Sequence, residues 1–246
     1  MAVEDLFFLT DTIVTISPEK AAYTLLFAAG VLLGLEVLSQ GSLIFFRGYK
    51  HIPIRGKHLD KFERKDNLYI SVNKFLTILF TFHVSKFVLN APTILWKISE
   101  LTFVNTIVSL FAMFLVYDLF YVQFHRVLHL RSIYGYIHKH HHRQKAPSRG
   151  YLDATNVHPV EFIIGEYLHL LVIYLIPSHV STVVVFVILG GILATLNHTR
   201  YDIRSVIFNV NVHDVHHRMP ESNYGQYTMF WDRIFSTYRA YKDIDN

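Results

Sequence analysis

The residues with the clearest chemical potential in this chain are histidines in three short motifs. An HxxxH motif and two HxxHH motifs hold eight imidazoles: His125 and His129, then His138, His141 and His142, and finally His213, His216 and His217. On a helix, residues three or four positions apart share one face, which brings their rings within reach of one ion. Eight imidazoles exceed the four ligands of a tetrahedral zinc site, so the set is typical of two metal ions with coordination positions left open.

The spacing favours a structured metal site over a loose chelating tract. With 16 histidines among 246 residues, a shuffled chain would contain HxxHH only about 0.07 times. The absence of cysteine excludes thiolate-bound iron, zinc ribbons and disulfides. Imidazole suits iron, copper, zinc or nickel, so spacing alone does not name the metal. We expect the isolated His83, His169 and His179 to be core groups, and His140, at an x position of HxxHH, to lie outside the ligand set.

The elements that must position these histidines are long and apolar. Hydrophobic residues make up 52% of the chain and charged residues 17%, whereas about a quarter of a soluble domain is charged. Five apolar stretches are candidate membrane helices, at residues 21–46, 68–90, 101–124, 160–176 and 179–197. The fourth is shorter than the roughly twenty residues that a span needs, and its alternative is a re-entrant or interfacial segment. We therefore predict an all-α integral membrane protein with four or five hydrophobic helices.

Basic residues indicate the orientation of these helices. Residues 47–67 hold seven Lys or Arg, residues 125–159 hold six and the tail after 198 holds six, whereas the segment before residue 20 has none. The positive-inside rule then places the N-terminus outside and the three basic regions in the cytoplasm, with five crossings or with three and a re-entrant hairpin. The histidine motifs thus belong to a cytosolic helical cap, residues 125–158 and 199–246. The acidic N-terminus has no basic n-region, so we expect no cleaved signal peptide.

An ordered set of motifs resembles the membrane-bound fatty acid hydroxylase and sterol desaturase superfamily. The set consists of HRVLHLRSIYGYIHKHHH, NVHPVEF, NHTRYD, HDVHH and FWDRIFSTY, within about residues 100–240. We therefore divide the chain into N-terminal membrane helices with a basic cytosolic loop, 1–100, and a hydroxylase-like catalytic domain, 101–246. Ser236 stands where relatives usually have glycine, which leaves the turn geometry there open. The WDRIF element is either a packed turn or a wall of the active site.

The resemblance implies a non-haem di-iron enzyme that uses O2 to hydroxylate or desaturate a lipid. It implies that the eight motif histidines bind two iron ions, with His158 and His198 as additional ligands. Cleaving an unactivated C–H bond needs a strong oxidant, which two irons generate from O2 while the protein positions the substrate and excludes water. The expected activity is that of a monooxygenase-type oxidoreductase in lipid biosynthesis.

Carboxylates near the histidines are candidates for orienting them, because a ligating histidine commonly donates its second N–H to a carboxylate. Asp118 lies two helical turns from His125, and two further carboxylates lie one turn from the additional ligands, Glu161 from His158 and Asp202 from His198. Asp214 points away from the ligand face of its motif, and we expect it to cap a helix or face solvent. Ionisable groups at membrane depth are usually functional, which also singles out Glu166, unless it pairs with a buried Lys or Tyr.

The chain lacks the motifs of several other chemistries. It has no HExxH for a zinc protease and no GxGxxG or GxxxxGK[ST] element for a nucleotide. We therefore expect electrons from a separate cytochrome b5-like or ferredoxin-like carrier, whose acidic face docks on the basic cytosolic surface. No nucleic-acid partner is expected, and the sequence does not indicate an oligomeric state.

Localisation and substrate follow from the same resemblance. A eukaryotic member would lie in the endoplasmic reticulum and a bacterial one in the inner membrane, with the active site on the cytosolic face. The His-Pro-x-Glu and Asn-His elements resemble the sterol desaturase branch, but the motifs leave open a sterol, a sphingolipid, a fatty acyl chain or an ether lipid. They also do not separate hydroxylation from desaturation. The alternative function is that of a divalent-metal transporter or metal-binding membrane protein.

Overall fold

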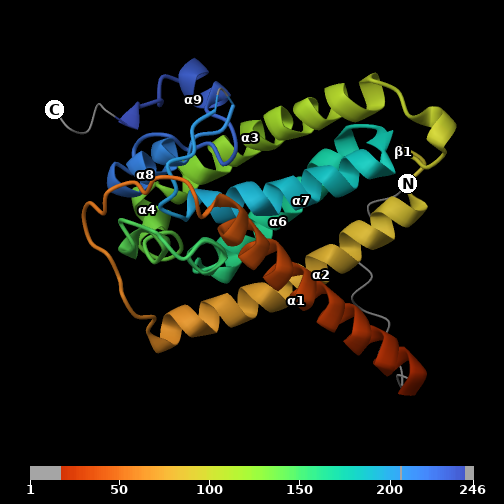
Figure 1. Ribbon diagram of the computed structural model, residues 1–246, viewed down its shortest axis with the longest axis horizontal. Helices are drawn as coiled ribbons and strands as arrows, with labels where there is room; N and C mark the ends of the chain where they lie inside the picture. Colours follow the sequence, from red (N-terminus) through yellow and green to blue (C-terminus); the bar gives the residue numbers. More distant parts are fainter. Residues whose placement is uncertain (1–17, 206, 242–246) are drawn as a thin grey trace.

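Five long helices correspond to the five apolar stretches of the sequence (Figure 1). They are α1 (Pro18–Phe46), α2 (Arg64–Asn90), α3 (Ser109–Leu128), α6 (Pro159–Leu175) and α7 (Val180–Asn197). The computed structural model describes residues 18–205 and 207–241. The N-terminal segment 1–17 and the end of the predicted cap, 242–246, lie outside the described residues.

Four helical segments are long and apolar enough to cross a membrane: Ala21–Phe46, Arg64–Asn90, Val104–Leu128 and Val180–Asn197. The fifth helix, α6, has 17 residues, which is about 26 Å against a hydrocarbon core of about 30 Å. The short connection that contains β2 joins it to α7, and both helices pack against α3. The prediction of an all-α membrane protein with four or five hydrophobic helices is therefore confirmed.

Local sequence signals explain where these helices begin. The backbone N–H of Glu63 donates to the Asp66 carboxylate (2.7 Å), a capping box that starts α2 four residues before its apolar stretch. Pro159 is the first residue of α6, a position that proline tolerates because its missing N–H would be unpaired there. A π-helical turn, η3 (Val104–Val108), leads into α3, which continues to Leu128 and so includes His125.

The core lies where α3, α6 and α7 pack together. The fully buried side chains there include Met113 of α3, Val172 and Ile173 of α6, and Phe186 of α7. Helix α2 packs along α6, and α1 crosses α7. The predicted N-terminal region is thus in direct contact with the predicted catalytic region, and α1 presents exposed apolar side chains such as Leu25, Leu33 and Phe45.

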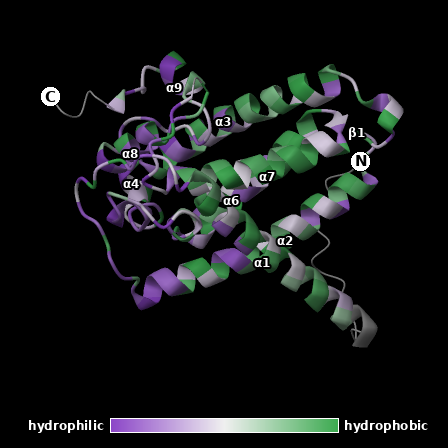
Figure 2. Cartoon of the chain, in the orientation of Figure 1, coloured by the Kyte–Doolittle hydropathy of each residue, from purple (hydrophilic) through white to green (hydrophobic). Residues whose placement is uncertain are grey.

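Hydropathy divides the molecule into two parts (Figure 2). Apolar residues dominate the long helices, whereas polar residues gather at the end that holds α4, α8 and α9. At the opposite end, two short parallel strands join the loop before α3 to the α6–α7 turn. They are β1 (Ile94–Leu95) and β2 (Ser178–His179). This pairing ties the predicted hairpin around Pro177 to the rest of the bundle.

Short elements build the polar end, where the sequence predicts the cap. They are α4 (Arg131–Tyr134), η4 (His141–Arg143), α5 (Tyr151–Ala154), α8 (Val210–Arg218) and α9 (Phe230–Ile234); the remaining short helix, η2 (Ile98–Glu100), precedes α3. The loop after α1 joins this end, because Ile52 N donates to the Arg200 carbonyl (2.6 Å). Asp214 does not face solvent as expected: its carboxylate is buried between Arg200 and Arg218.

Candidate metal centre

Nine histidines converge into two groups at the polar end of the bundle. The five-histidine group consists of His125, His129, His138, His142 and His216, and the four-histidine group of His141, His198, His213 and His217. Within each group the candidate ligand atoms all lie within 4.8 Å of one another. The structure therefore brings together all eight motif histidines and His198, one of the two predicted additions.

Each HxxHH motif is shared between the two groups, whereas its spacing predicts that all three rings lie within reach of one ion. The i and i+4 residues stay together, as in the pairs His138 and His142 or His213 and His217, whereas His141 and His216 join the other group. The reason is rotational, because neighbouring helical residues point about 100° apart. The adjacent imidazoles of each His-His pair therefore point toward different groups, and each of the two motifs contributes to both groups.

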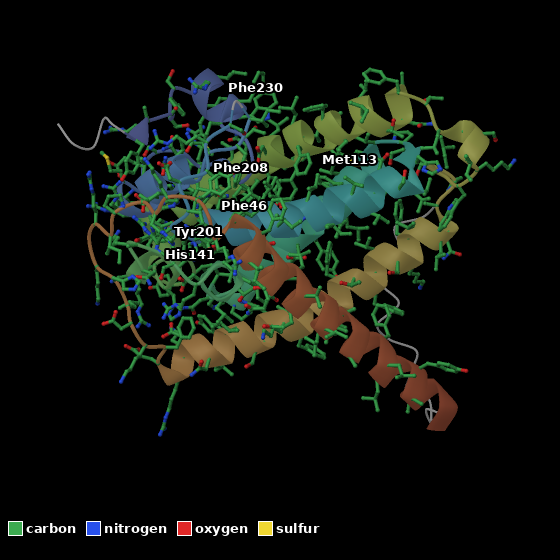
Figure 3. The ribbon with its side chains drawn as sticks, viewed as in Figure 1. Phe46, Met113, His141, Tyr201, Phe208 and Phe230 are labelled. Carbon is green, nitrogen blue, oxygen red and sulfur yellow. The ribbon has the colours of Figure 1, made fainter. Side chains whose placement is uncertain are left out.

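Four elements carry these side chains to one place. His125 lies in the last turn of α3 and His129 is its C-cap. The second motif occupies the turn before η4 and η4 itself, whereas α8 carries the third. His198 is the C-cap of α7. Figure 3 labels His141 at this end, where ring nitrogens from these elements gather.

Hydrogen bonds fix the tautomer of several rings. Nδ1–H groups donate to backbone carbonyls from His125 to Tyr224 (2.8 Å), from His198 to Ala194 (2.9 Å), from His216 to Ser222 (2.7 Å) and from His217 to Gln144 (2.9 Å). A neutral imidazole carries one proton, so a donating Nδ1 leaves a bare lone pair on Nε2. In these four histidines the Nε2 lone pair is free to bind a cation.

The facing nitrogens fit metal ions. His138 Nε2 lies 3.0 Å from both His125 Nε2 and His142 Nε2. In the four-histidine group, His198 Nε2 lies 3.3 Å from both His141 Nε2 and His213 Nε2. Two nitrogens that share one ion at about 2.1 Å, at angles of about 90–109°, lie about 3.0–3.4 Å apart. Bare lone pairs at such distances repel each other unless a cation lies between them, so the donor set fits two metal ions.

Burial keeps these rings neutral, the form in which imidazole binds a metal. Desolvation lowers the pKa of His129 to about 3. It also lowers the pKa of His217 well below its usual range, with the neighbouring histidines adding to the effect. The other ligands outside the long helices are shifted in the same direction, namely His138, His141, His142, His198, His213 and His216. At neutral pH the two groups are therefore available as neutral nitrogen donors.

Of the three carboxylates predicted to orient ligands, Glu161 contacts one. Its Oε2 lies 2.9 Å from His138 Nδ1, and both side chains are buried. Its partner is thus His138 of the second motif instead of the predicted His158. A carboxylate at this distance favours the ring proton on Nδ1 through its charge, which leaves the Nε2 lone pair of His138 facing the five-histidine group.

His158 and Asp202 do not take the predicted roles. His158 is the N-cap of α6, where its Nδ1 accepts from Val160 N (3.2 Å), and it belongs to neither histidine group. The Asp202 carboxylate accepts from Arg204 (2.6 Å) and Asn211 (2.6 Å) and touches no histidine. We therefore leave His158 out of the candidate ligand set and Asp202 out of the ligand-orienting set.

Two buried aspartates accept hydrogen bonds from the backbone of the loop beside the histidine groups. Asp118 accepts hydrogen bonds from the backbone N–H groups of Gln226, Tyr227 and Thr228, at 3.1, 3.0 and 2.5 Å. Asp232, in the WDRIF element, accepts from the N–H groups of Tyr224 and Gly225, both at 2.8 Å. Because the Tyr224 carbonyl accepts from His125, both carboxylates position a ligand through the loop. Asp232 is not among the predicted site residues, although the WDRIF motif contains it.

The remaining histidines are bound elsewhere. His140 Nε2 lies 2.9 Å from the Asp66 carboxylate, which agrees with its predicted place outside the ligand set. His169 is buried and shares a hydrogen bond with the Tyr227 hydroxyl (2.7 Å). His83 pairs with the Tyr167 hydroxyl, and His179 caps α7 through Ser181. His169 and His179 are buried, as expected of core groups, whereas His83 is only partly buried.

A cavity of about 220 Å³ leads from the metal centre into the bundle. Histidines of both groups, including His125 and His198, lie at one end. Its wall is formed by α1, α2, α3, α6 and α7 and is mainly apolar, with Leu35, Phe80 and Val187 among the lining residues. Gly190 also lines it, and a side chain there would meet the Tyr227 hydroxyl at 2.9 Å. An apolar ligand in this cavity would therefore reach both histidine groups.

The chain belongs to the fatty acid hydroxylase family, whose profile matches residues 110–237. Methylsterol monooxygenase 1 of Rattus norvegicus is 34% identical over 137 residues, which cover 51% of this chain and 46% of that protein. A fatty acid hydroxylase of Mycosarcoma maydis is 35% identical over 129 residues, 52% of this chain and 33% of that protein.

A third relative is a Delta(7)-sterol 5(6)-desaturase of Leptosphaeria maculans, 31% identical over 128 residues, 51% of this chain and 35% of that protein. The chain thus spans less than half the length of these three relatives. No solved structure matches the chain significantly. The matched family region contains all nine grouped histidines and also Glu161.

Proposed function

We propose that this protein is an O2-dependent oxidoreductase that hydroxylates or desaturates a membrane lipid at two iron ions. The observation that carries the proposal is the pair of histidine groups, with facing lone pairs, at one end of an apolar cavity. The three relatives, a methylsterol monooxygenase, a fatty acid hydroxylase and a sterol desaturase, are all named for reactions on lipids. They support a lipid substrate and an oxidative reaction.

The five-histidine and four-histidine groups would each hold one iron ion. When bound, the two irons supply the activation of O2 that attack on an unactivated C–H bond requires. Glu161 holds the His138 proton on Nδ1, and four carbonyls do the same for other ligands. The protein thereby orients the ligands before the metals arrive, which is the usual role of groups behind a metal ligand.

The cavity would align the lipid. Its wall combines bulky side chains with small residues such as Gly165, Gly191 and Ala194, which leave room for an apolar body between α6 and α7. The apolar lining keeps bulk water away from the reacting carbon. A lipid in the surrounding bilayer would have only to move sideways between helices to reach this space.

We place the metal centre on the cytosolic face of the endoplasmic reticulum or bacterial inner membrane, as the basic loops indicate. Reducing electrons would come from a separate carrier with an acidic face, because complementary charge speeds such encounters. Exposed basic side chains at the metal end, including Lys50, Lys57 and Arg131, support this docking. Turnover with a purified carrier should slow as ionic strength rises, and salt-independent turnover would contradict the docking proposal.

The function is tested with the purified full chain in lipid nanodiscs. Iron content, reductant-driven O2 consumption and mass spectrometry of the lipids are measured together. A lipid that gains one oxygen or loses two hydrogens identifies the reaction and the substrate. His141→Ala should abolish product formation and lower bound iron, whereas His51→Ala, outside both groups, should change neither. Equal iron content in the two variants would contradict the ligand assignment.

The same purified protein can be used to distinguish the proposed enzyme function from that of a divalent-metal transporter. A transporter reconstituted into vesicles would move metal across the bilayer and oxidise nothing. The apolar wall of the cavity favours the enzyme, because a metal path needs polar groups along its length. Metal flux without an oxidised lipid would reject the proposal.

A further inference from the structure

The part of the cavity that faces the bundle contains polar side chains that the metal centre does not use. Most of them already have partners within the protein. Tyr117 donates to the Gly165 carbonyl (3.1 Å), and His169 shares its hydrogen bond with Tyr227 (2.7 Å). The hydroxyl of Thr77 donates to the Asn73 carbonyl (3.0 Å). These groups are accounted for by the fold.

Two lining groups are different. The Glu166 carboxylate has no hydrogen-bond or ion-pair partner among residues 18–205 and 207–241, and it opens onto the cavity. The hydroxyl of Tyr151, from α5, is buried and lines the same cavity; it has no hydrogen bond of good geometry in this part of the chain, although the Thr77 side chain lies near it. Burial raises the pKa of Tyr151, and the nearby Glu166 carboxylate raises it further.

Leaving such groups unpaired in an apolar cavity is unfavourable, at about 1–3 kcal/mol for a neutral group and more for a charged one. Their chemistry is complementary, since a carboxylate accepts hydrogen bonds and a phenol donates one. A hydroxyl group is both a donor and an acceptor. One hydroxyl placed between them would donate to Glu166 and accept from Tyr151, which satisfies both at once.

We propose that Glu166 and Tyr151 form a recognition site for the hydroxyl group of a neutral lipid alcohol, the substrate class of the proposed oxidoreductase. That the bound alcohol is also the substrate rests on the proposed function. Its binding does not, because binding needs neither iron nor O2. In its ionised form the Glu166 carboxylate disfavours lipids with an anionic head, such as free fatty acids. The lipid therefore enters the cavity with its hydroxyl held by protein and its hydrocarbon body against the apolar wall.

The position of the site limits which carbon reacts. Glu166 lies five residues after Glu161 on α6, a rise of about 7.5 Å along the helix. Glu161 contacts the metal ligand His138, so the hydroxyl site lies within about two helical turns of the metal centre. The oxidised carbon should therefore lie a few bonds or one to two fused rings from the hydroxyl, instead of at the end of a long chain.

The test uses the purified full chain after metal removal, with two tritiated alcohols, cholesterol and hexadecanol, and the methyl ether of each. A methyl ether keeps the acceptor oxygen and loses the donor. Saturation binding should show at least one alcohol bound about tenfold more tightly than its ether, because the ether leaves Glu166 unpaired. A preference for cholesterol over its ether would indicate a sterol ligand, and a preference for hexadecanol over its ether would indicate a straight-chain alcohol.

Variants assign the preference to the two side chains. Glu166→Leu should lower the affinity for the alcohol to that for the ether, and Tyr151→Phe should weaken alcohol binding severalfold. Asp60→Asn, which removes an exposed carboxylate outside the cavity, is the control and should bind like the native chain. Melting temperatures close to the native value show that each variant is folded.

Three results would overturn the proposal: equal affinity for alcohol and ether on both scaffolds, a preference that survives Glu166→Leu, or tighter binding of hexadecylamine than of hexadecanol. The last would identify a cationic lipid instead. An alcohol preference without any O2-dependent product would reject the proposed oxidoreductase and leave the hydroxyl site standing. The two proposals therefore fail independently.

Discussion

His138 Nδ1 and Glu161 Oε2 lie 2.9 Å apart, with 1% and 7% of the two side chains exposed. The contact joins the turn before η4 to the first helical turn of α6. Glu161→Gln keeps the shape of the side chain but removes the charge that holds the proton on Nδ1. We expect the affinity of the five-histidine group for iron to fall about 10–100-fold, measured by competition with a chelator.

The control for this substitution is Asp202→Asn, which makes the same chemical change at a carboxylate that touches Arg204 and Asn211 but no histidine. Its iron affinity should match that of the native chain. Loss of iron in Asp202→Asn, or native affinity in Glu161→Gln, would contradict the assignment of Glu161 as the orienting carboxylate.

A second prediction separates the two histidines that the sequence offered as additional ligands. His198→Ala removes a nitrogen from the four-histidine group, so bound iron should fall from about two ions toward one for each chain. His158→Ala removes only the N-cap of α6 and should keep both ions, with a loss of stability of about 1 kcal/mol. Iron analysis of the two variants checks this, and loss of iron in His158→Ala would return that residue to the ligand set.

We predict that Asp118 contributes mainly to the stability of the folded protein. Its carboxylate accepts three backbone N–H groups of the loop 226–228, and its side chain is fully buried. In Asp118→Asn one acceptor oxygen becomes an amide that faces these donors, so the folded state should lose about 3 kcal/mol. Thermal unfolding in detergent measures the loss. Asp60→Asn, whose side chain is 87% exposed, should leave the melting temperature within error of the native value.

The sequence predicted the set of ligands better than their grouping. Motif spacing was sufficient to find eight of the nine grouped histidines, because imidazoles at i and i+4 share a helical face. Spacing could not show that His141 and His216 leave their own motifs. That division depends on how the turn before η4 packs against α8, a contact between segments about 75 residues apart.

The predicted roles of His158 and Asp202 were wrong for different reasons. His158 precedes Pro159, and a residue before proline favours extended backbone, so it ends the loop and caps α6. That signal was present in the sequence. Asp202 has no such signal, because its partner Asn211 is brought near by the turn that leads into α8. Helical spacing did place Asp118 on the inner face of α3, but not its partners, which are backbone groups 108 to 110 residues away.

Replacing Ser236 by glycine should stabilise the folded protein. The residue has φ +57°, in the left-handed region that favours glycine. Ser236→Gly should relieve this strain and raise stability by about 1 kcal/mol, seen as a higher melting temperature. Ser132→Gly, at an exposed position of α4, should lower stability instead, because glycine disfavours helix. A lower melting temperature for Ser236→Gly would show that the turn needs the serine.

Removal of the metals should make the stability of the protein strongly dependent on pH. Burial lowers the pKa of His129 to about 3 and places those of His138 and His217 well below their usual range. Unfolded histidines titrate near pH 6.5, so below that pH the unfolded chain binds protons that the folded chain does not. The stability is complete above about pH 6.5 and is lost as the pH falls, by about 1.4 kcal/mol per pH unit for each such histidine.

The measurement is the melting temperature of the metal-free protein between pH 7.5 and 5.5, which should fall steadily with pH. His217→Gln removes one titrating group, so the slope of melting temperature against pH should fall by the contribution of one proton. This holds even if the substitution changes the melting temperature at pH 7.5. A constant melting temperature over this range would mean that the folded chain already carries these protons. The two histidine groups would then not be held as neutral donors, and metal binding would have to release protons from them.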